Sequence, residues 1–153
     1  MLLYLMRHGE ASHSSPDQPS SLTPKGISDV ARVVEHLIRK KGLKLDAIWH
    51  SPKTRAIQTA EIVWKAMENP PLPLEKRSDL SPDGDLEQVH QEILDHSSGN
   101  LLIVSHLPFI PGLAGLLLGG EGLSLTFPTA GIAAFERGKT FKLLWTLDPS
   151  TLK

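Results

Sequence analysis

Short apolar runs alternate with stretches of helical periodicity along most of this chain, and this alternation constrains its fold more than any other feature. Alternating strands and helices build βαβ units, whose strands lie parallel in one sheet with helices packed on its two faces. The expected strands are short and continuously apolar, as buried parallel strands are. They cover residues 2–6, 46–50 and 100–106.

Four helices are expected between and after these strands. The first two begin with a hydroxyl residue followed by proline, which combines an N-cap with the residue favoured in the first helical turn. Ser51 is the expected N-cap of the second helix and Asn-Pro-Pro at 69–71 its stop, while Asp85 caps the third. The predicted helical segments cover residues 24–41, 52–68, 86–96 and 108–118.

The end of the chain departs from the βαβ pattern. Two apolar segments, "GIAAFE" at 131–136 and "FKLLWTL" at 141–147, flank an Arg-Gly-Lys turn and predict an antiparallel hairpin. We therefore expect an α/β fold: a three-layer sandwich with a mostly parallel central sheet, helices on both faces and an antiparallel hairpin at one edge.

Composition narrows the class of protein. A length of 153 residues fits one domain, 1–153, with a single good core. The net charge of −1 gives no reason to expect nucleic acid or a membrane surface as a partner. The chain has no cysteine, which excludes disulfides and thiolate metal sites and fits a reducing compartment. We expect a cytoplasmic protein; its oligomeric state stays open.

Three of the expected strands end in polar residues. The first leads into Arg7, His8 and Gly9, the second precedes Arg55 by a few residues, and the third leads into His106. Ligands of such sheets bind at the carboxyl ends of the strands, so these side chains should meet at one edge. Two guanidinium groups, two imidazoles and a helix N-terminus together predict an anion site, with a phosphoryl group as its occupant.

The residue types suit phosphoryl transfer. A neutral imidazole at His8 can attack phosphorus and form a covalent intermediate. Arg7 and Arg55 can each grip two phosphoryl oxygens with a planar fork, and His106 can donate to an oxygen in the transition state. Gly9 leaves room where the backbone turns beside the phosphate. Taken singly, Arg7 and His8 fit a solvated strand end as well as a site, Arg55 is more often a solvated helix arginine, and His106 is more often a structural histidine. The prediction therefore depends on their combination.

The motifs that carry these residues resemble those of a known family. "LMRHGEA", "LTPKG", "SPKTRAIQTA" and "VSHLP" occur in the order found in the histidine phosphatase superfamily, which has the phosphoglycerate mutase-like fold. The short chain and the "SHLP" motif are most similar to SixA-type phosphohistidine phosphatases. The resemblance implies that His8 is phosphorylated, that Arg7, Arg55 and His106 form its phosphate pocket, and that catalysis needs no metal.

The resemblance does not single out one residue as the proton donor for the leaving group. Many members of the family use an acidic residue in a region that reads "KRSDLSPDGDLE" here. Asp79 is the best positional match and Asp83 the second, while Asp85 fits a helix cap better. Glu10 has no expected role.

Without a clear match for the proton donor, the sequence favours a substrate whose leaving group departs without acid catalysis. An imidazole departs more readily than an alkoxide. The short segment between residues 69 and 101 also offers no insertion that could enclose a small sugar phosphate. We therefore expect hydrolysis of phosphohistidine on a phosphorylated protein. The alternatives are a broad-specificity phosphatase of small phosphate esters, more remotely a phosphosugar mutase, and a non-catalytic phosphate-binding regulatory module.

Overall fold

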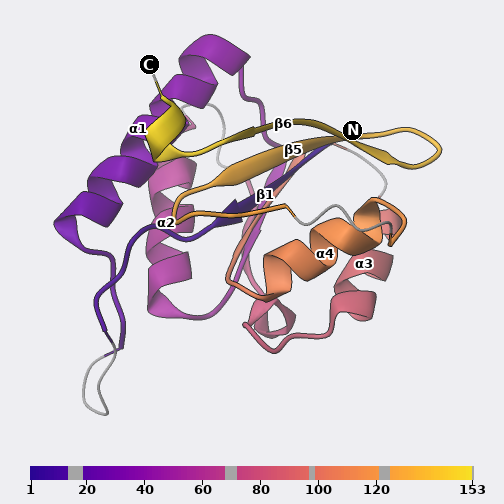
Figure 1. Ribbon diagram of the computed structural model, residues 1–153, viewed down its shortest axis with the longest axis horizontal. Helices are drawn as coiled ribbons and strands as arrows, with labels where there is room; N and C mark the ends of the chain where they lie inside the picture. Colours follow the sequence, from indigo (N-terminus) through magenta and orange to yellow (C-terminus); the bar gives the residue numbers. More distant parts are fainter. Residues whose placement is uncertain (14–18, 68–71, 97–98, 121–124, 153) are drawn as a thin grey trace.

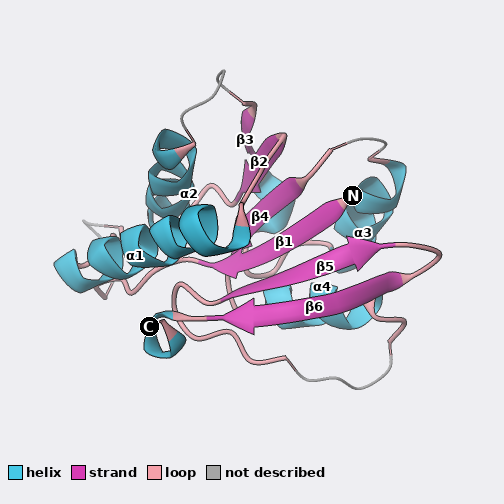
Figure 2. Cartoon of the chain, turned by 90° about the horizontal axis from the view of Figure 1, so that it is seen from above, coloured by secondary structure: helices cyan, strands magenta, loops and turns pink. Residues whose placement is uncertain are grey.

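The computed structural model describes residues 1–13, 19–67, 72–96, 99–120 and 125–152. Its centre is a six-stranded sheet with the strand order β3-β2-β4-β1-β5-β6 (Figure 2). The first four strands in that order are parallel, and β5 and β6 run antiparallel at the other edge. The strands are β1 (Leu2–Arg7), β2 (Ala47–His50), β3 (Leu74–Lys76), β4 (Leu101–Ser105), β5 (Ile132–Arg137) and β6 (Phe141–Leu147).

Four α-helices cover the two faces of the sheet (Figures 1 and 2). They are α1 (Pro24–Lys41), α2 (Thr54–Ala66), α3 (Leu86–Asp95) and α4 (Phe109–Leu117). Helices α1 and α2 pack on one face, whereas α3 and α4 pack on the other. Two short 3₁₀ helices, η1 (Ser78–Leu80) and η2 (Pro149–Thr151), complete the fold, and η2 lies against α1.

Alternation along β1 builds a hydrophobic core on each face. Leu3 and Leu5 are fully buried against the layer of α3 and α4, while Tyr4 and Met6 are buried against α1 and α2. Successive residues of a strand point to opposite faces, so a continuously apolar strand is what a sheet covered on both sides requires. The α/β three-layer fold with an edge hairpin, expected from the sequence, is confirmed.

Helix α1 has the ends that the sequence predicts. The side chain of Thr23 accepts a hydrogen bond from the backbone N–H of Gly26, and Pro24 is the first helical residue. Gly42 ends the helix in the left-handed conformation, with φ of 62°. Asp85 likewise caps α3 by accepting from the backbone N–H of Gln88.

Helix α2 begins differently from the prediction. Its N-cap is Lys53, whose side chain makes no capping bond, and Ser51 lies outside the helix. The hydroxyl of Ser51 accepts a hydrogen bond from the backbone N–H of Lys53 at 3.2 Å, which leaves its own proton free for another partner. The predicted stop at 69–71 lies outside the described residues, and β3 and both 3₁₀ helices were not predicted.

Candidate active site

The ends of three adjacent strands bring the predicted site residues together. Strands β2, β4 and β1 are neighbours and parallel, so the residues after their carboxyl ends share one edge of the sheet. Arg7 and His8 come from the end of β1, Arg55 from the first turn of α2, and His106 from the end of β4. All four line one cavity of about 340 Å³, together with Glu10, Ala11, Ser20, Leu107 and Thr129.

Hydrogen bonds fix the position and the protonation pattern of the His8 ring. Its Nδ1 lies 2.8 Å from the carbonyl oxygen of Gly9, which can only accept, so Nδ1 carries the proton. Its Nε2 accepts a hydrogen bond of 3.2 Å from Nε of Arg55. Nε2 therefore carries the lone pair, as a nucleophilic imidazole must, and in this structure that lone pair accepts the N–H of Arg55.

Burial and neighbouring cations keep both site histidines neutral. Burial is the main cause that lowers the pKa of His8 to about 4, against the hydrogen bond to Gly9, and the charges of Arg55 and Arg7 lower it further. Burial also lowers the pKa of His106 to about 3, with contributions from His8 and the nearby cations. Both imidazoles are therefore uncharged at neutral pH.

The two arginines are held in the site by different means. Nη1 of Arg7 donates to the carbonyl oxygen of Phe127 at 3.1 Å, and its buried Nε has no hydrogen-bond partner among the described residues. Burial lowers the pKa of both guanidinium groups, and the charge of Arg55 lowers that of Arg7 further. Arg7 and Arg55 line the same cavity, and one of them has an N–H without an acceptor among the described residues. This arrangement predicts that the cavity binds an anion.

Thr59 ties α2 to the end of β1 and was not anticipated from the sequence. It is fully buried, and its hydroxyl accepts from the backbone N–H of Gly9 at 3.0 Å while donating to the carbonyl oxygen of Arg55 at 2.9 Å. This hydroxyl links the backbones that carry His8 and Arg55. The contact spans 50 residues of sequence, so only the fold could show it.

Gly9, predicted from the sequence as a phosphate-binding residue, is not among the residues that line the cavity. Its N–H is taken by Thr59 and its carbonyl by His8. A Cβ at this position would lie 2.7 Å from Cγ2 of Val30 and 2.9 Å from the carbonyl oxygen of Gly26. The glycine is therefore needed for the close approach of α1 to the end of β1.

The structure does not bring Asp79 to the cavity of His8. Arg77 donates to its carboxylate with Nε at 3.2 Å and with Nη2 at 2.9 Å, and Asp79 lines a separate hollow with Glu92. Asp83 is exposed and lines neither cavity. The acidic side chain that lines the His8 cavity is Glu10, which accepts a hydrogen bond of 2.7 Å from the hydroxyl of Thr23.

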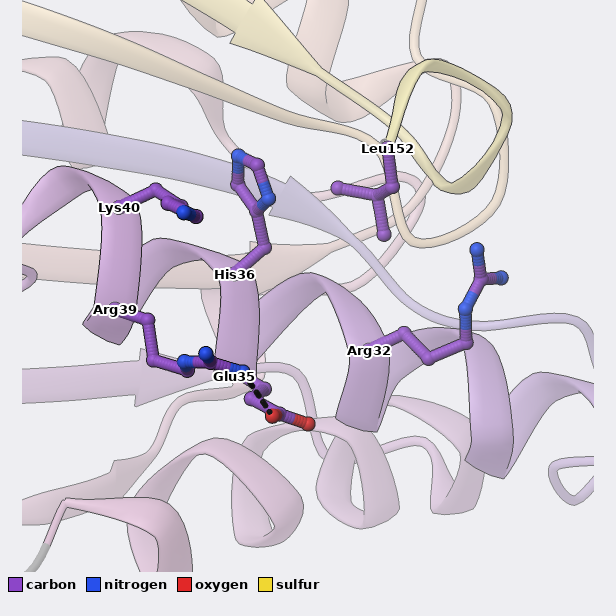
Figure 3. A pocket seen from close by; sticks show the side chains of 6 residues that line it. All are labelled: Arg32, Glu35, His36, Arg39, Lys40 and Leu152. Carbon is purple, nitrogen blue, oxygen red and sulfur yellow. Dashed lines mark hydrogen bonds and ion pairs between the residues drawn. The ribbon is translucent and has the colours of Figure 1, made fainter.

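A further hollow, of about 240 Å³, lies between α1 and Leu152, away from the strand ends (Figure 3). It is rich in basic side chains, but Arg39 is paired with Glu35 at 3.1 Å and Arg32 with Asp29 at 3.3 Å. Its residues are Arg32, Glu35, His36, Arg39, Lys40 and Leu152. These side chains stand on an open helix surface and lack the converging buried groups of the His8 cavity.

Within the described residues there is no group of three or more histidine or acidic side chains placed to bind a metal ion. No described helix combines the length and the hydrophobicity needed to cross a bilayer.

Comparison with known proteins identifies the family of this chain. The sequence matches the histidine phosphatase superfamily (branch 1) over residues 3–82, more than half of the chain. The chain belongs to that superfamily. Its activity class is accordingly that of a phosphatase, and the matched region holds Arg7, His8 and Arg55.

Solved structures of the superfamily have the same fold. The protein histidine phosphatase SixA complexed with tungstate is 27% identical, with a TM-score of 0.87 and 100% of both chains covered. The alpha-ribazole phosphatase from Shigella flexneri is 19% identical, with a TM-score of 0.76 over 94% of this chain and 95% of that one. A phosphoserine phosphatase from Entamoeba histolytica is 18% identical, with a TM-score of 0.69 and 95% of each chain covered. No curated protein sequence gives a significant match.

Proposed function

We propose that this histidine phosphatase hydrolyses phosphohistidine on a protein through a covalent phospho-His8 intermediate. The observation that carries the proposal is the neutral His8 ring, whose Nε2 faces the guanidinium of Arg55 in the same cavity as Arg7 and His106. An unprotonated nucleophile among fixed cations suits attack on a phosphoryl group, because the cations stabilise its charge without protonating the base.

The reaction would take place in two displacements. First, the phosphoryl oxygens take the N–H groups of Arg55 away from Nε2 of His8, whose lone pair then forms a bond to phosphorus while the bond to the substrate nitrogen breaks. The departing imidazole keeps that electron pair and takes a proton from solvent water, and the proton that the attacking water loses in the second displacement restores the balance. Second, a water molecule attacks phosphorus, the bond to Nε2 breaks, and inorganic phosphate leaves with His8 restored.

The substrate class follows from what the cavity holds and from the relatives. The cavity is small, at about 340 Å³, and the acid expected at Asp79 is engaged by Arg77 in another hollow. An imidazole leaving group needs little acid catalysis, whereas an alkoxide needs much. The similarity to the protein histidine phosphatase SixA supports the same choice, and that structure contains tungstate, a tetrahedral oxyanion like phosphate.

One observation favours a second candidate, a phosphatase of small phosphate esters. Glu10 lines the cavity and could protonate an alkoxide or phenoxide leaving group. The relatives of similar fold include enzymes named for alpha-ribazole phosphate and phosphoserine. The non-catalytic alternative has less support, because a binding module does not need a neutral nucleophile aligned in its phosphate pocket.

We further propose that residues 1–153 form one histidine phosphatase domain that acts in the cytoplasm. This proposal rests on the single sheet shared by all strands and on the absence of cysteine.

Turnover measurements separate these candidates. A phosphohistidine peptide, a phosphoserine peptide and an aryl phosphate are compared as substrates of the wild type, His8→Ala and His90→Ala. We expect the highest kcat/KM for phosphohistidine, no turnover by His8→Ala, and wild-type rates for His90→Ala, which changes a histidine on α3 outside the cavity. A higher kcat/KM for either ester would favour the second candidate, and no turnover of any substrate would refute the enzymatic proposal.

A further inference from the structure

Ser51 and His106 are in direct contact at the edge of the cavity, although 55 residues separate them in the sequence. Ser51 lies in the turn between β2 and α2 and is fully buried. Its Oγ is 2.7 Å from Nε2 of His106, and the same Oγ accepts the backbone N–H of Lys53 at 3.2 Å. The hydroxyl therefore touches one donor and one imidazole nitrogen.

The hydroxyl proton of Ser51 decides which nitrogen of His106 is protonated. A buried hydroxyl that fails to donate its proton loses a hydrogen bond that it would make to water in the unfolded chain, which destabilises the folded state. Lys53 N–H can only donate, so within the described part of the chain the one acceptor in contact with this hydroxyl is Nε2 of His106. Nε2 must then hold the lone pair, and the proton of the neutral ring must sit on Nδ1.

Nδ1 of His106 has no partner of its own. It is buried and makes no hydrogen bond to any described residue, although His106 lines the cavity and its ring centroid is 5.0 Å from that of His8. The lowered pKa of His106, about 3, keeps the ring neutral. A neutral imidazole carries one N–H, and the contact with Ser51 decides which of the two nitrogens has it. An unpartnered N–H beside the nucleophile matches an oxygen of the transferred phosphoryl group.

We propose that Ser51 is a positioning residue that holds His106 in the Nδ1–H tautomer, so that this N–H donates to the phosphoryl group attacked by His8. Arg7 and Arg55 supply charge, and His106 supplies a neutral donor whose orientation is set by a serine in the turn between β2 and α2. The inference rests on the proposed phosphoryl transfer for its purpose, but the tautomer itself is a property of the free protein.

Nitrogen-15 NMR of the histidine rings measures the tautomer without any substrate. At pH 7 the His106 ring, assigned by its absence from the spectrum of His106→Gln, should show a pyrrole-type Nδ1 and a pyridine-type Nε2. In Ser51→Ala a population with the proton on Nε2 should appear, and Ser51→Thr should restore the wild-type pattern. Ser105→Ala is the matched control: Ser105 is equally buried, is the last residue of the adjacent strand β4, and donates to the carbonyl oxygen of Leu80 instead.

The catalytic consequence is measured with the same variants. We expect Ser51→Ala to lower kcat by about 10- to 100-fold, by analogy with the residues that orient metal-ligating histidines, with KM changed less and Ser51→Thr recovering most of the loss. A wild-type ring protonated at Nε2, a pattern unchanged in Ser51→Ala, or a changed pattern with unchanged kcat would each overturn the proposal. Because the tautomer is read without turnover, a protein with no phosphatase activity would refute the proposed function and leave the tautomer result separate.

Discussion

At the scale of single residues, the protonation states of the cavity follow from hydrogen bonds that leave little choice. His8 must carry its proton on Nδ1, because the carbonyl of Gly9 accepts there. Burial then keeps the ring neutral despite that bond, and the lone pair of Nε2 accepts a hydrogen bond from Nε of Arg55. A nucleophile that is unprotonated and already oriented avoids both the proton removal and the reorganisation that a solvated imidazole would need.

Removing the carboxylate of Asp79 tests whether it has a part in catalysis. Because Arg77 holds this side chain in a different hollow, we expect Asp79→Asn to keep kcat/KM for a phosphohistidine peptide within about twofold of the wild type. Its free energy of unfolding should fall by about 0.5 kcal/mol, since the ion pair is partly exposed.

Glu10→Gln is the matched comparison, because it removes the carboxylate that does line the cavity. We expect it to slow hydrolysis of an aryl phosphate more than hydrolysis of phosphohistidine. A large loss of phosphohistidine activity in Asp79→Asn, measured as steady-state kcat/KM, would mean that Asp79 moves into the site during the reaction.

At the residue scale, the sequence indicated the site through a combination of residue types that follow strand ends, not through any one residue. Arg7, His8, Arg55 and His106 were found in this way, and the structure brings them together. The sequence does not show that Arg77 holds Asp79 in a separate hollow, because the contact of Arg77 with Glu92 on α3 has no periodic signal. The contacts of Ser51 and Thr59 stayed hidden for the same reason.

At the scale of elements, the position of the nucleophile depends on how closely α1 approaches the end of β1. The carbonyl of Glu10 accepts the backbone N–H of Thr23 at 3.0 Å, and a Cβ on Gly26 would lie 2.1 Å from that same oxygen. Gly9 meets α1 from the other side, against Val30. Two glycines thus allow backbone-to-backbone contact beside His8, and each has a packing role that a loop glycine does not.

Gly9→Ala tests this contact. The added methyl group would force Val30 and the backbone of Gly26 away, so we expect the free energy of unfolding to fall by about 1–3 kcal/mol and phosphatase activity to fall with it. Urea denaturation monitored by circular dichroism measures the change. Adding Val30→Ala should recover part of the lost stability, because it removes Cγ2 of Val30, the atom that would lie 2.7 Å from the new Cβ.

Gly115→Ala is the control for glycine replacement in general. This residue lies in α4, and a Cβ there would meet no atom within 4 Å. We expect this variant to be more stable by about 0.5–1 kcal/mol, because alanine favours the helix. If Gly9→Ala were as stable as the wild type, the close approach of α1 would not be a constraint.

Element boundaries were predictable where a local signal marks them. The N-cap Thr23 and the left-handed Gly42 define α1 without any tertiary contact, and β6 begins at Phe141 as expected. Strand β3 has only three residues and pairs with the edge of β2, so its sequence carries too little periodicity to detect. Ser51-Pro52 resembled a helix cap, but the hydroxyl of Ser51 is used by His106.

At the scale of the whole molecule, burying two neutral histidines in a site of fixed cations makes stability depend on pH. In the unfolded chain both would titrate near the ordinary pKa of about 6.5, whereas the folded pKa values are about 4 for His8 and about 3 for His106. Between these values the unfolded state binds more protons than the folded state. Stability must therefore fall as pH falls below about 6.5.

The expected loss is measurable over one pH unit. From pH 6.5 to 5.5 the two histidines together should lower the free energy of unfolding by about 2 kcal/mol. Urea titrations at several pH values measure the slope, and the double variant His8→Asn, His106→Asn serves as the control, with a much flatter dependence. A wild-type protein whose stability is constant over this range would show that the two rings are not held neutral.

The transfer of the phosphoryl group to His8 is the central claim, and rapid-quench trapping tests it most directly. A phosphorylated substrate is mixed with enzyme, quenched in alkali and mapped by mass spectrometry and phosphorus NMR. We predict an acid-labile phosphoryl group on Nε2 of His8, present in His90→Ala and absent in His8→Ala. Steady turnover with the phosphoryl group on another residue, or with no trapped intermediate under conditions that slow its hydrolysis, would contradict the account.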